Sequence, residues 1–295
     1  MDKKDIVEFF LKKGILLTPE EFDAINEENY MQFLEKKLKE NKENIIVETA
    51  KKGKITNDEF IKILNKNFEF LNDLIVKKAE IVSINKAKKI TSNITISGRV
   101  KEKNSKGFIL EDLTDEAEIL YEEKEKDDVG IGDVLGVNGY FKDNVFFAKQ
   151  IIWPDIPLEI QTKTISIKIT LTTKIKEDMG GFIICPSATT HNHIIGGFGK
   201  IGKIKIIKSE NEFIILAFSP NQEINDMDAI KILKKRKLPE LLVDNLIKEV
   251  PNIFWIYNNN KNWFKIYKGV MIISTDKNSF AEISNEEINF GVIKL

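Results

Sequence analysis

Residues 181–197, GFIICPSATTHNHIIGG, hold the groups whose types and spacing come nearest to a catalytic or metal site. The only cysteine, Cys185, and both histidines, His191 and His193, lie within this stretch. An apolar run ends at Pro186, where a buried strand commonly delivers catalytic side chains, but the next residues are neither metal ligands nor general bases: Ser187, Ala188, Thr189 and Thr190. A His-x-His pair can bind a metal, yet no Asp or Glu lies close enough in sequence to complete a ligand shell. We therefore expect no metal and no cofactor, a structural role for the histidines, and a buried Cys185.

Charge and composition narrow the classes of function. Lys and Arg number 45 against 46 Asp and Glu, so the net charge of −1 gives no overall attraction to nucleic acid. Arg99 and Arg236 are the only arginines, which leaves few candidates for bidentate contacts with guanine and disfavours sequence-specific base recognition. The single cysteine excludes an internal disulfide. Without a signal peptide or a stretch of roughly 18 apolar residues, we expect a soluble cytoplasmic protein that does not bind a membrane.

Residues 1–78 have the apolar spacing of helices and predict a helical N-terminal domain. Thr18 as N-cap, with Glu21 three residues later, is a strong helix start. A third helix is predicted over 28–39 and a fourth over 56–75. The fourth carries an apolar stripe that we expect in the core: Phe60, Ile63, Leu64 and Phe68.

From about Ile94 the apolar residues alternate, which is the pattern of strands. Five short strand signals are separated by turn residues, at 94–103, 106–114, 116–123, 133–143 and 144–155. This spacing is typical of a small closed antiparallel barrel. It predicts a five-stranded OB-fold over 79–157, entered through an extended connector.

Residues 158–295 mix apolar strands with helices, which predicts an α/β layer domain. Two helices are predicted, over 225–239 and 239–250. The strand signals lie at 165–171, 180–186, 203–209, 212–220, 252–257 and 268–275.

The order of these elements, and several stretches of sequence, resemble the small subunit of archaeal DNA polymerase D, of the B-subunit family. Residues 7–25 are similar to its N-terminal helical segment, 96–123 and 130–157 to its OB domain, and 231–254 with 265–275 to the end of its phosphoesterase domain. The resemblance implies a multidomain α+β chain. Its parts would be a helical domain (1–78), an OB-fold barrel (79–157) and a shortened calcineurin-like α/β phosphoesterase domain (158–295).

In that family, Asp, His and Asn side chains at strand ends hold two divalent metals, which activate water for 3′ to 5′ hydrolysis of DNA. By resemblance, none of the matching positions that we can place in this sequence keeps its ligand. These positions are Thr172, Lys174, Ser187, Ala188, Thr189, Thr190, Phe218, Asn258 and Asn260. The resemblance therefore implies an inactive phosphoesterase domain and a chain that is not an enzyme.

The leading hypothesis is a non-catalytic accessory or scaffold subunit of the DNA replication machinery. By resemblance, its partner would be a DNA polymerase large subunit or another replisome protein. Trp255, Tyr257 and Trp263 lie close together around the polar run NNNKNW, and we expect their partial burial at a partner contact.

Two alternative functions stay open. An OB-fold can stack single-stranded nucleic acid on aromatic residues beside lysines, and the candidates are Lys101, Lys103, Lys106, Phe108, Tyr140 and Lys142. Barrel core positions also require aromatic residues at such spacing, and the loop EEKEKDD is acidic. The basic run 231–239 is either a solvated helix face or a contact for DNA or an acidic partner. The other alternative is a residual metal-dependent phosphoesterase or exonuclease, but Asp155, Asp178, Asp226 and Asp228 stand in no matching motif.

Overall fold

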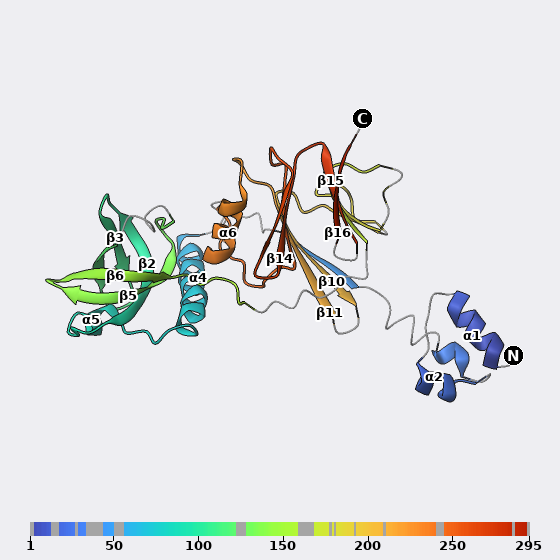
Figure 1. Ribbon diagram of the computed structural model, residues 1–295, viewed down its shortest axis with the longest axis horizontal. Helices are drawn as coiled ribbons and strands as arrows, with labels where there is room; N and C mark the ends of the chain where they lie inside the picture. The colour runs from blue at the N-terminus through green and yellow to red at the C-terminus, as the bar shows by residue number, and fades with distance from the viewer. Residues whose placement is uncertain are drawn as a thin grey trace.

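The described part of the chain forms an N-terminal helical part, a closed barrel and a two-sheet sandwich (Figure 1). None of the described helices is long and apolar enough to cross a membrane. The computed structural model describes residues 3–12, 18–26, 29–33, 44–49, 56–121, 128–158, 168–176, 179, 181–191, 193–208, 211–239, 245–284 and 287–293.

The N-terminal part contains α1 (Lys3–Lys12) and α2 (Pro19–Ala24). The predicted start of α2 is confirmed. The Glu21 N–H donates to Thr18 Oγ1, and the Thr18 N–H donates to the Glu21 carboxylate, which is a reciprocal capping box. The predicted helix 28–39 is helical over 30–33, and the rest of it lies outside the described residues.

The barrel contains all five predicted strands. It closes in the order β2-β3-β4-β6-β5, with β5 also paired to β2, and only β4 and β6 are parallel neighbours. Gly139 permits the close approach of β5 and β6, since a Cβ there would lie 2.1 Å from the carbonyl oxygen of Phe147. The strands are β2 (Ile94–Lys103), β3 (Gly107–Glu111), β4 (Glu116–Leu120), β5 (Val134–Lys142) and β6 (Val145–Ile152).

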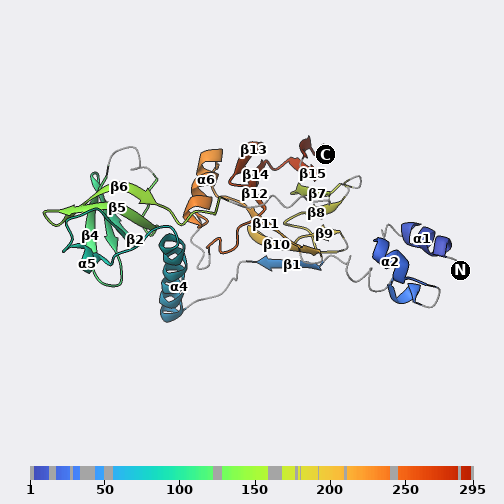
Figure 2. The ribbon, with the colours of Figure 1, turned by 60° about the horizontal axis from the view of Figure 1, so that its bottom comes forward.

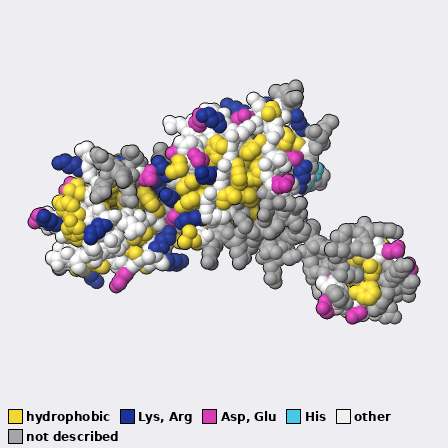
Figure 3. Space-filling model, viewed as in Figure 1, with side chains coloured by type: hydrophobic (Ala, Val, Ile, Leu, Met, Phe, Trp, Pro, Cys, Tyr) yellow, Lys and Arg dark blue, Asp and Glu magenta, His cyan; other side chains and the backbone are white. Residues whose placement is uncertain are grey.

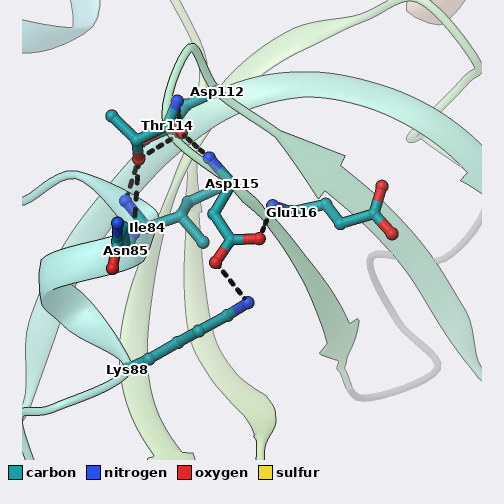
Figure 4. A network of polar contacts seen from close by, with 7 residues as sticks. All are labelled: Ile84, Asn85, Lys88, Asp112, Thr114, Asp115 and Glu116. Atoms are coloured by element: carbon teal, nitrogen blue, oxygen red, sulfur yellow. Dashed lines mark hydrogen bonds and ion pairs between the residues drawn. The ribbon is translucent and has the colours of Figure 1, made fainter.

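The connector before the barrel contains a short helix, α5 (Ile84–Ala87), where the sequence predicts only an extended segment. The turn between β3 and β4 holds this helix against the barrel (Figure 4). The Ile84 N–H donates to Asp112 Oδ2 at 2.8 Å, and Lys88 Nζ pairs with Asp115 Oδ2 at 2.7 Å. Asp112 thus satisfies a helix N–H that the helix itself leaves unpaired.

Helix α4 (Asn57–Val76) packs on the barrel through its C-terminal half. Leu71 and Ile75 are buried against Val134, and Ser97 Oγ donates to Asn72 Oδ1 at 2.6 Å. The predicted stripe was wrong about the N-terminal half, where Phe60 and Leu64 are exposed. The spacing of apolar residues predicted the helix, but it did not predict which part of the helix the barrel covers.

The sandwich consists of a six-stranded sheet, in the order β1-β10-β11-β12-β14-β13, and a five-stranded sheet, in the order β16-β15-β7-β8-β9. The six predicted strands of this region are β7, β8, β10, β11, β12 and β14. The core between the sheets includes Leu171, Ile184, Ile204 and Trp255. The bounds are β1 (Asn44–Thr49), β7 (Ile169–Thr172), β8 (Phe182–Ile184), β9 (Ile194–Ile195), β10 (Ile201–Lys208), β11 (Asn211–Phe218), β12 (Ile253–Tyr257), β13 (Trp263–Tyr267), β14 (Val270–Thr275), β15 (Ser279–Ser284) and β16 (Glu287–Val292).

The sequence predicted the first 78 residues to be helical, and this is wrong for β1. Residues 44–49 form the edge strand of the six-stranded sheet and pair antiparallel with β10. Ile45 and Val47 pack on the core between the sheets, whereas Glu48 pairs with Lys203 at 2.7 Å. A half-buried strand buries alternate residues, and this six-residue segment is too short for its period to stand out.

The helix α6 (Asp226–Lys235) is confirmed, and Leu233 packs beside Phe254 on the six-stranded sheet. The second predicted helix is wrong for its described residues 245–250. They follow an extended path, in which the Leu238 N–H donates to the Asn245 carbonyl and the Ile247 N–H to that of Arg236. These tertiary bonds override the helical preference of the sequence.

The basic segment at the end of α6 joins the sandwich to the barrel. Lys235 Nζ lies 2.7 Å from Asp133 Oδ2 and 5.3 Å from the centre of the Trp153 ring, and Lys231 pairs with Asp128 at 2.8 Å. The expectation of a solvated helix face is therefore wrong for Lys231 and Lys235, because acidic side chains of the barrel pair with them.

Candidate functional site

The residues expected to have lost metal ligands lie at one end of the sandwich. In the five-stranded sheet β7, β8 and β9 are parallel, and in the six-stranded sheet β11, β12 and β14 are parallel. The turn 276–278 joins β14 to β15, and Thr173 Oγ1 donates to the Lys277 carbonyl at 3.0 Å. The carboxyl ends of β7 and β14 therefore meet, at the edge where open α/β sheets usually place their sites.

Uncharged side chains at this end hydrogen-bond to one another. Asn258 Nδ2 donates to Ser219 Oγ at 3.2 Å, and Asn259 Nδ2 donates to Ser274 Oγ at 2.9 Å. Thr172 Oγ1 donates to the carbonyl of Lys174 at 2.6 Å. Asn259 and Thr172 are buried, so their polar atoms are used within the fold.

The other expected positions are spread over the same strand ends. Ser187, Thr189, Thr190 and Asn260 are exposed, Ala188 is half-buried, and Phe218 is fully buried in the sandwich. Cys185 is buried, whereas His191 and His193 are exposed beside β9. Among the described residues, no three His, Cys, Asp or Glu side chains gather as a possible metal site. The amides and hydroxyls of this set can hold neighbouring loops in place, and its one charged side chain, Lys174, donates to Asn278 Oδ1 at 3.4 Å.

The proposed nucleic-acid residues of the barrel differ in their surroundings. Phe108 is fully buried in the barrel core, so its ring cannot stack on a base. Lys101 pairs with Glu116 at 2.7 Å, and Lys103 Nζ donates to the carbonyl of Val129 at 2.7 Å. Lys106 is exposed at the turn between β2 and β3.

A second aromatic residue accompanies Tyr140 on the hairpin of β5 and β6. The rings of Tyr140 and Phe147 stack with centroids 5.6 Å apart and planes 15° apart, and both are half-buried. Lys149 Nζ lies 5.5 Å from the Tyr140 ring centre, and Lys142 is exposed at the hairpin tip. Phe147 pairs directly with Tyr140 across the two strands, so it joins Tyr140 and Lys142 as a candidate at this hairpin.

Two of the three proposed partner-binding aromatics are core residues, and the structure corrects this expectation. Trp255 is fully buried, and its Nε1 donates to Thr275 Oγ1 at 2.9 Å. Tyr257 is buried too, and its hydroxyl donates to the Gly199 carbonyl. Both point between the sheets because alternate residues of β12 face that core. Trp263 faces the other side and packs, half-buried, on the core beside α6.

Asp155, which the sequence offered only as a carboxylate outside any metal motif, is a polar centre between the barrel and the sandwich. Its carboxylate lies 2.6 Å from Lys268 Nζ and 3.0 Å from the Tyr267 hydroxyl, which donates to it. Burial, and then Asp155, raise the pKa of Tyr267. Burial lowers the pKa of Lys78. Burial also lowers the pKa of Arg236, to about 10, and the negative charge of Asp155 acts in the opposite direction on both residues. One carboxylate thus balances several cations at this junction.

The comparisons with known proteins give one informative relative. The chain is 24% identical over 194 residues to the DNA polymerase II small subunit of Thermoplasma acidophilum. The match covers 54% of this chain and 40% of the length of that protein. This similarity supports a distant relation to DNA polymerase small subunits.

The other comparisons add no functional information. No known protein family matches the chain. Among solved structures, the hypothetical protein ygiW from E. coli aligns with 25% of this chain and 89% of its own, at 18% identity and a TM-score of 0.22.

Proposed function

We propose that this chain is a non-catalytic accessory subunit of a replicative DNA polymerase and binds the polymerase large subunit. The observation that carries the proposal is the similarity to a DNA polymerase II small subunit over 54% of the chain. A protein that serves as a small subunit must present a surface to a larger one. Other proteins of the replication machinery are the alternative partners.

The proposal assigns the barrel to the OB-fold and the sandwich to a degenerate calcineurin-like phosphoesterase. The strand order β2-β3-β4-β6-β5, with parallel β4 and β6, supports the first assignment. The common end of the parallel strands in the two sheets supports the second. At that end the uncharged pairs of Asn258 with Ser219, and of Asn259 with Ser274, occupy the place of a catalytic centre.

The test is co-purification with the polymerase large subunit encoded in the same genome. We expect one complex in size-exclusion chromatography and a measurable dissociation constant in calorimetry. The isolated chain, supplied with Mn²⁺ and single-stranded DNA, should release no nucleotides. Absence of binding would overturn the role as a subunit, whereas nuclease activity that survives stringent purification would support the residual phosphoesterase instead.

The stacked pair Tyr140 and Phe147 favours single-stranded nucleic acid as a second candidate ligand. Aromatic stacking on a base contributes about 1 to 3 kcal/mol. Loss of one ring in Phe147→Ala should therefore weaken binding of an oligothymidylate about 5-fold to 150-fold in fluorescence anisotropy. Leu113→Ala, at an 87% exposed apolar residue on the turn between β3 and β4, is the control. Equal affinity of Phe147→Ala and the wild type would refute stacking at this hairpin.

A further inference from the structure

The sandwich has an open side, along the edge strands β13 and β16. Strand β13 pairs antiparallel with β14, and a two-residue turn of Lys268 and Gly269 joins them, both with positive φ. In such a hairpin the pair next to the turn, Tyr267 with Val270, exchanges hydrogen bonds, and alternate pairs then do not. The main-chain groups of Phe264 and Ile266 therefore point away from β14.

The same geometry holds at β16. The Ile293 N–H donates to the Asn278 carbonyl at 2.6 Å, so these two residues form a hydrogen-bonded pair next to Val292 and Ser279. In the register of β16 with β15, Ile288, Phe290 and Val292 therefore fall at the alternate positions, which do not exchange hydrogen bonds with β15. Their main-chain N–H and C=O groups point away from β15. Among the described residues, no strand pairs with this edge, because β16 ends the five-stranded sheet.

The side chains at these positions are apolar and face inward. Ile288, Phe290 and Val292 lie opposite Ile283, Ala281 and Ser279, all three of which are buried. Side chains of directly paired residues share one face of a sheet, so β16 continues the inner face beyond the covered core. Phe290 nevertheless stays 40% exposed and Val292 62% exposed.

Strand β13 lies on the same side of the sandwich. Figure 2 shows β13 and β15 on the side opposite to β1. Figure 3 shows hydrophobic side chains gathered over this part of the sandwich. Phe264 and Ile266 of β13 pair with Ile273 and Met271, which pack on the core between the sheets. The side chains of Phe264 and Ile266 are exposed.

At each edge, main-chain groups that pair with no described strand and apolar side chains thus occur at the same residues. An edge of this kind selects an extended segment, which satisfies the main chain by pairing and buries alternate side chains. Strand β16 offers three such residues and β13 two. Lysines 261, 265 and 268 adjoin β13, whereas β16 carries no basic residue within its bounds.

We propose that β16 binds an extended segment of the polymerase large subunit, which adds to the five-stranded sheet as a further strand. The segment carries apolar side chains at alternate positions, which cover Ile288, Phe290 and Val292. This inference rests on the proposed function, since the partner is the large subunit named there. A nucleic acid would leave the apolar residues uncovered, because its backbone cannot supply the alternating N–H and C=O groups of a strand.

The test measures binding of the large subunit to Val292→Lys and Phe290→Lys. Both side chains are exposed, and that of Val292 is more exposed than that of Phe290. We therefore expect Val292→Lys to fold like the wild type, as circular dichroism would show. A lysine buried under an added strand should raise the dissociation constant tenfold or more. Leu113→Lys is the matched control, because Leu113 is an 87% exposed apolar residue on the barrel.

Hydrogen exchange gives an independent readout. The amides of Ile288, Phe290 and Val292 should exchange more slowly in the complex, and those of β2 should not change. Wild-type affinity in both lysine variants would overturn the inference and leave the proposed function intact. Failure of the wild-type chain to bind the large subunit would overturn both. An isolated chain that dimerises, and dissociates with Phe290→Lys, would assign this edge to a second copy and also overturn the inference.

Discussion

Replacement of Asp155 by Asn tests whether one carboxylate holds the barrel to the sandwich. Asp155 has φ +42°, which Asn tolerates as well as Asp, so Asp155→Asn changes the charge with little change in shape. The side chain is 14% exposed, and that of Lys268, 2.6 Å away, is 21% exposed. Lys268 also donates to the Ile156 carbonyl, so it stays in place without its counter-charge.

The expected loss follows from this burial. Removal of one partner from a fully buried ion pair costs about 3 to 5 kcal/mol, and the residual exposure of both groups favours the lower end, about 3 kcal/mol. A chain of this size loses about 2 to 4 °C in melting temperature per kcal/mol. Asp155→Asn should therefore melt roughly 6 to 12 °C below the wild type in differential scanning calorimetry.

The matched control is Asp143→Asn. Asp143 also has positive φ, +50°, but it is exposed at the tip of the hairpin of β5 and β6. Its replacement should change stability by no more than about 0.5 kcal/mol. Equal melting temperatures for Asp155→Asn and Asp143→Asn would show that the contacts of Asp155 contribute no stability, and would refute the reasoning.

Two further substitutions test the sandwich. Glu249 accepts hydrogen bonds from Lys205 and Lys203, and these, led by Lys205, lower its pKa below the ordinary 4.5. A lowered pKa in the folded state stabilises the fold above pH 4.5, and this contribution is lost as the pH falls through the folded value. Because Glu249 is partly exposed, Glu249→Gln should lower the free energy of unfolding by only about 0.5 kcal/mol at pH 7. Below the pKa of Glu249 in the folded state, the substitution should not change it. Urea unfolding at several pH values measures both. A cost that persists at pH 2 would contradict this assignment. Trp255→Phe should lower the free energy of unfolding by about 3 kcal/mol in thermal unfolding, since it removes the hydrogen bond to buried Thr275 and leaves a cavity. If Trp255→Phe kept its stability but lost partner binding, Trp255 would instead be a partner-binding residue.

The barrel was the most predictable part of the fold. Each of its five strands is flanked by turn residues and pairs with strands close in sequence, so alternation alone located them. The sandwich was less predictable, because its pairings join distant segments. Strand β1 meets β10 more than a hundred residues later, and no local pattern carries that information.

The candidate site was predictable in position but not in detail. The ends of β7, β8, β11 and β12 were expected where they lie, because buried apolar runs mark strand ends. Burial of Phe108, Trp255 and Tyr257 was not predicted, since a strand's period gives two faces but does not say which face is covered. The edge at β16 was missed because no strand signal was assigned to residues 287–292.

The place of β1 has a consequence for the order in which the protein folds. The barrel is continuous in sequence, so it can form as soon as residue 152 has left the ribosome. The sandwich encloses the barrel in sequence, with β1 before it and β7 to β16 after it. A fragment that starts after residue 55 would lack one edge strand and expose the inner-face residues of β10 beside it. The barrel thus behaves as an insertion in the sandwich, whose edge strand β1 stays unpaired until β10 is made.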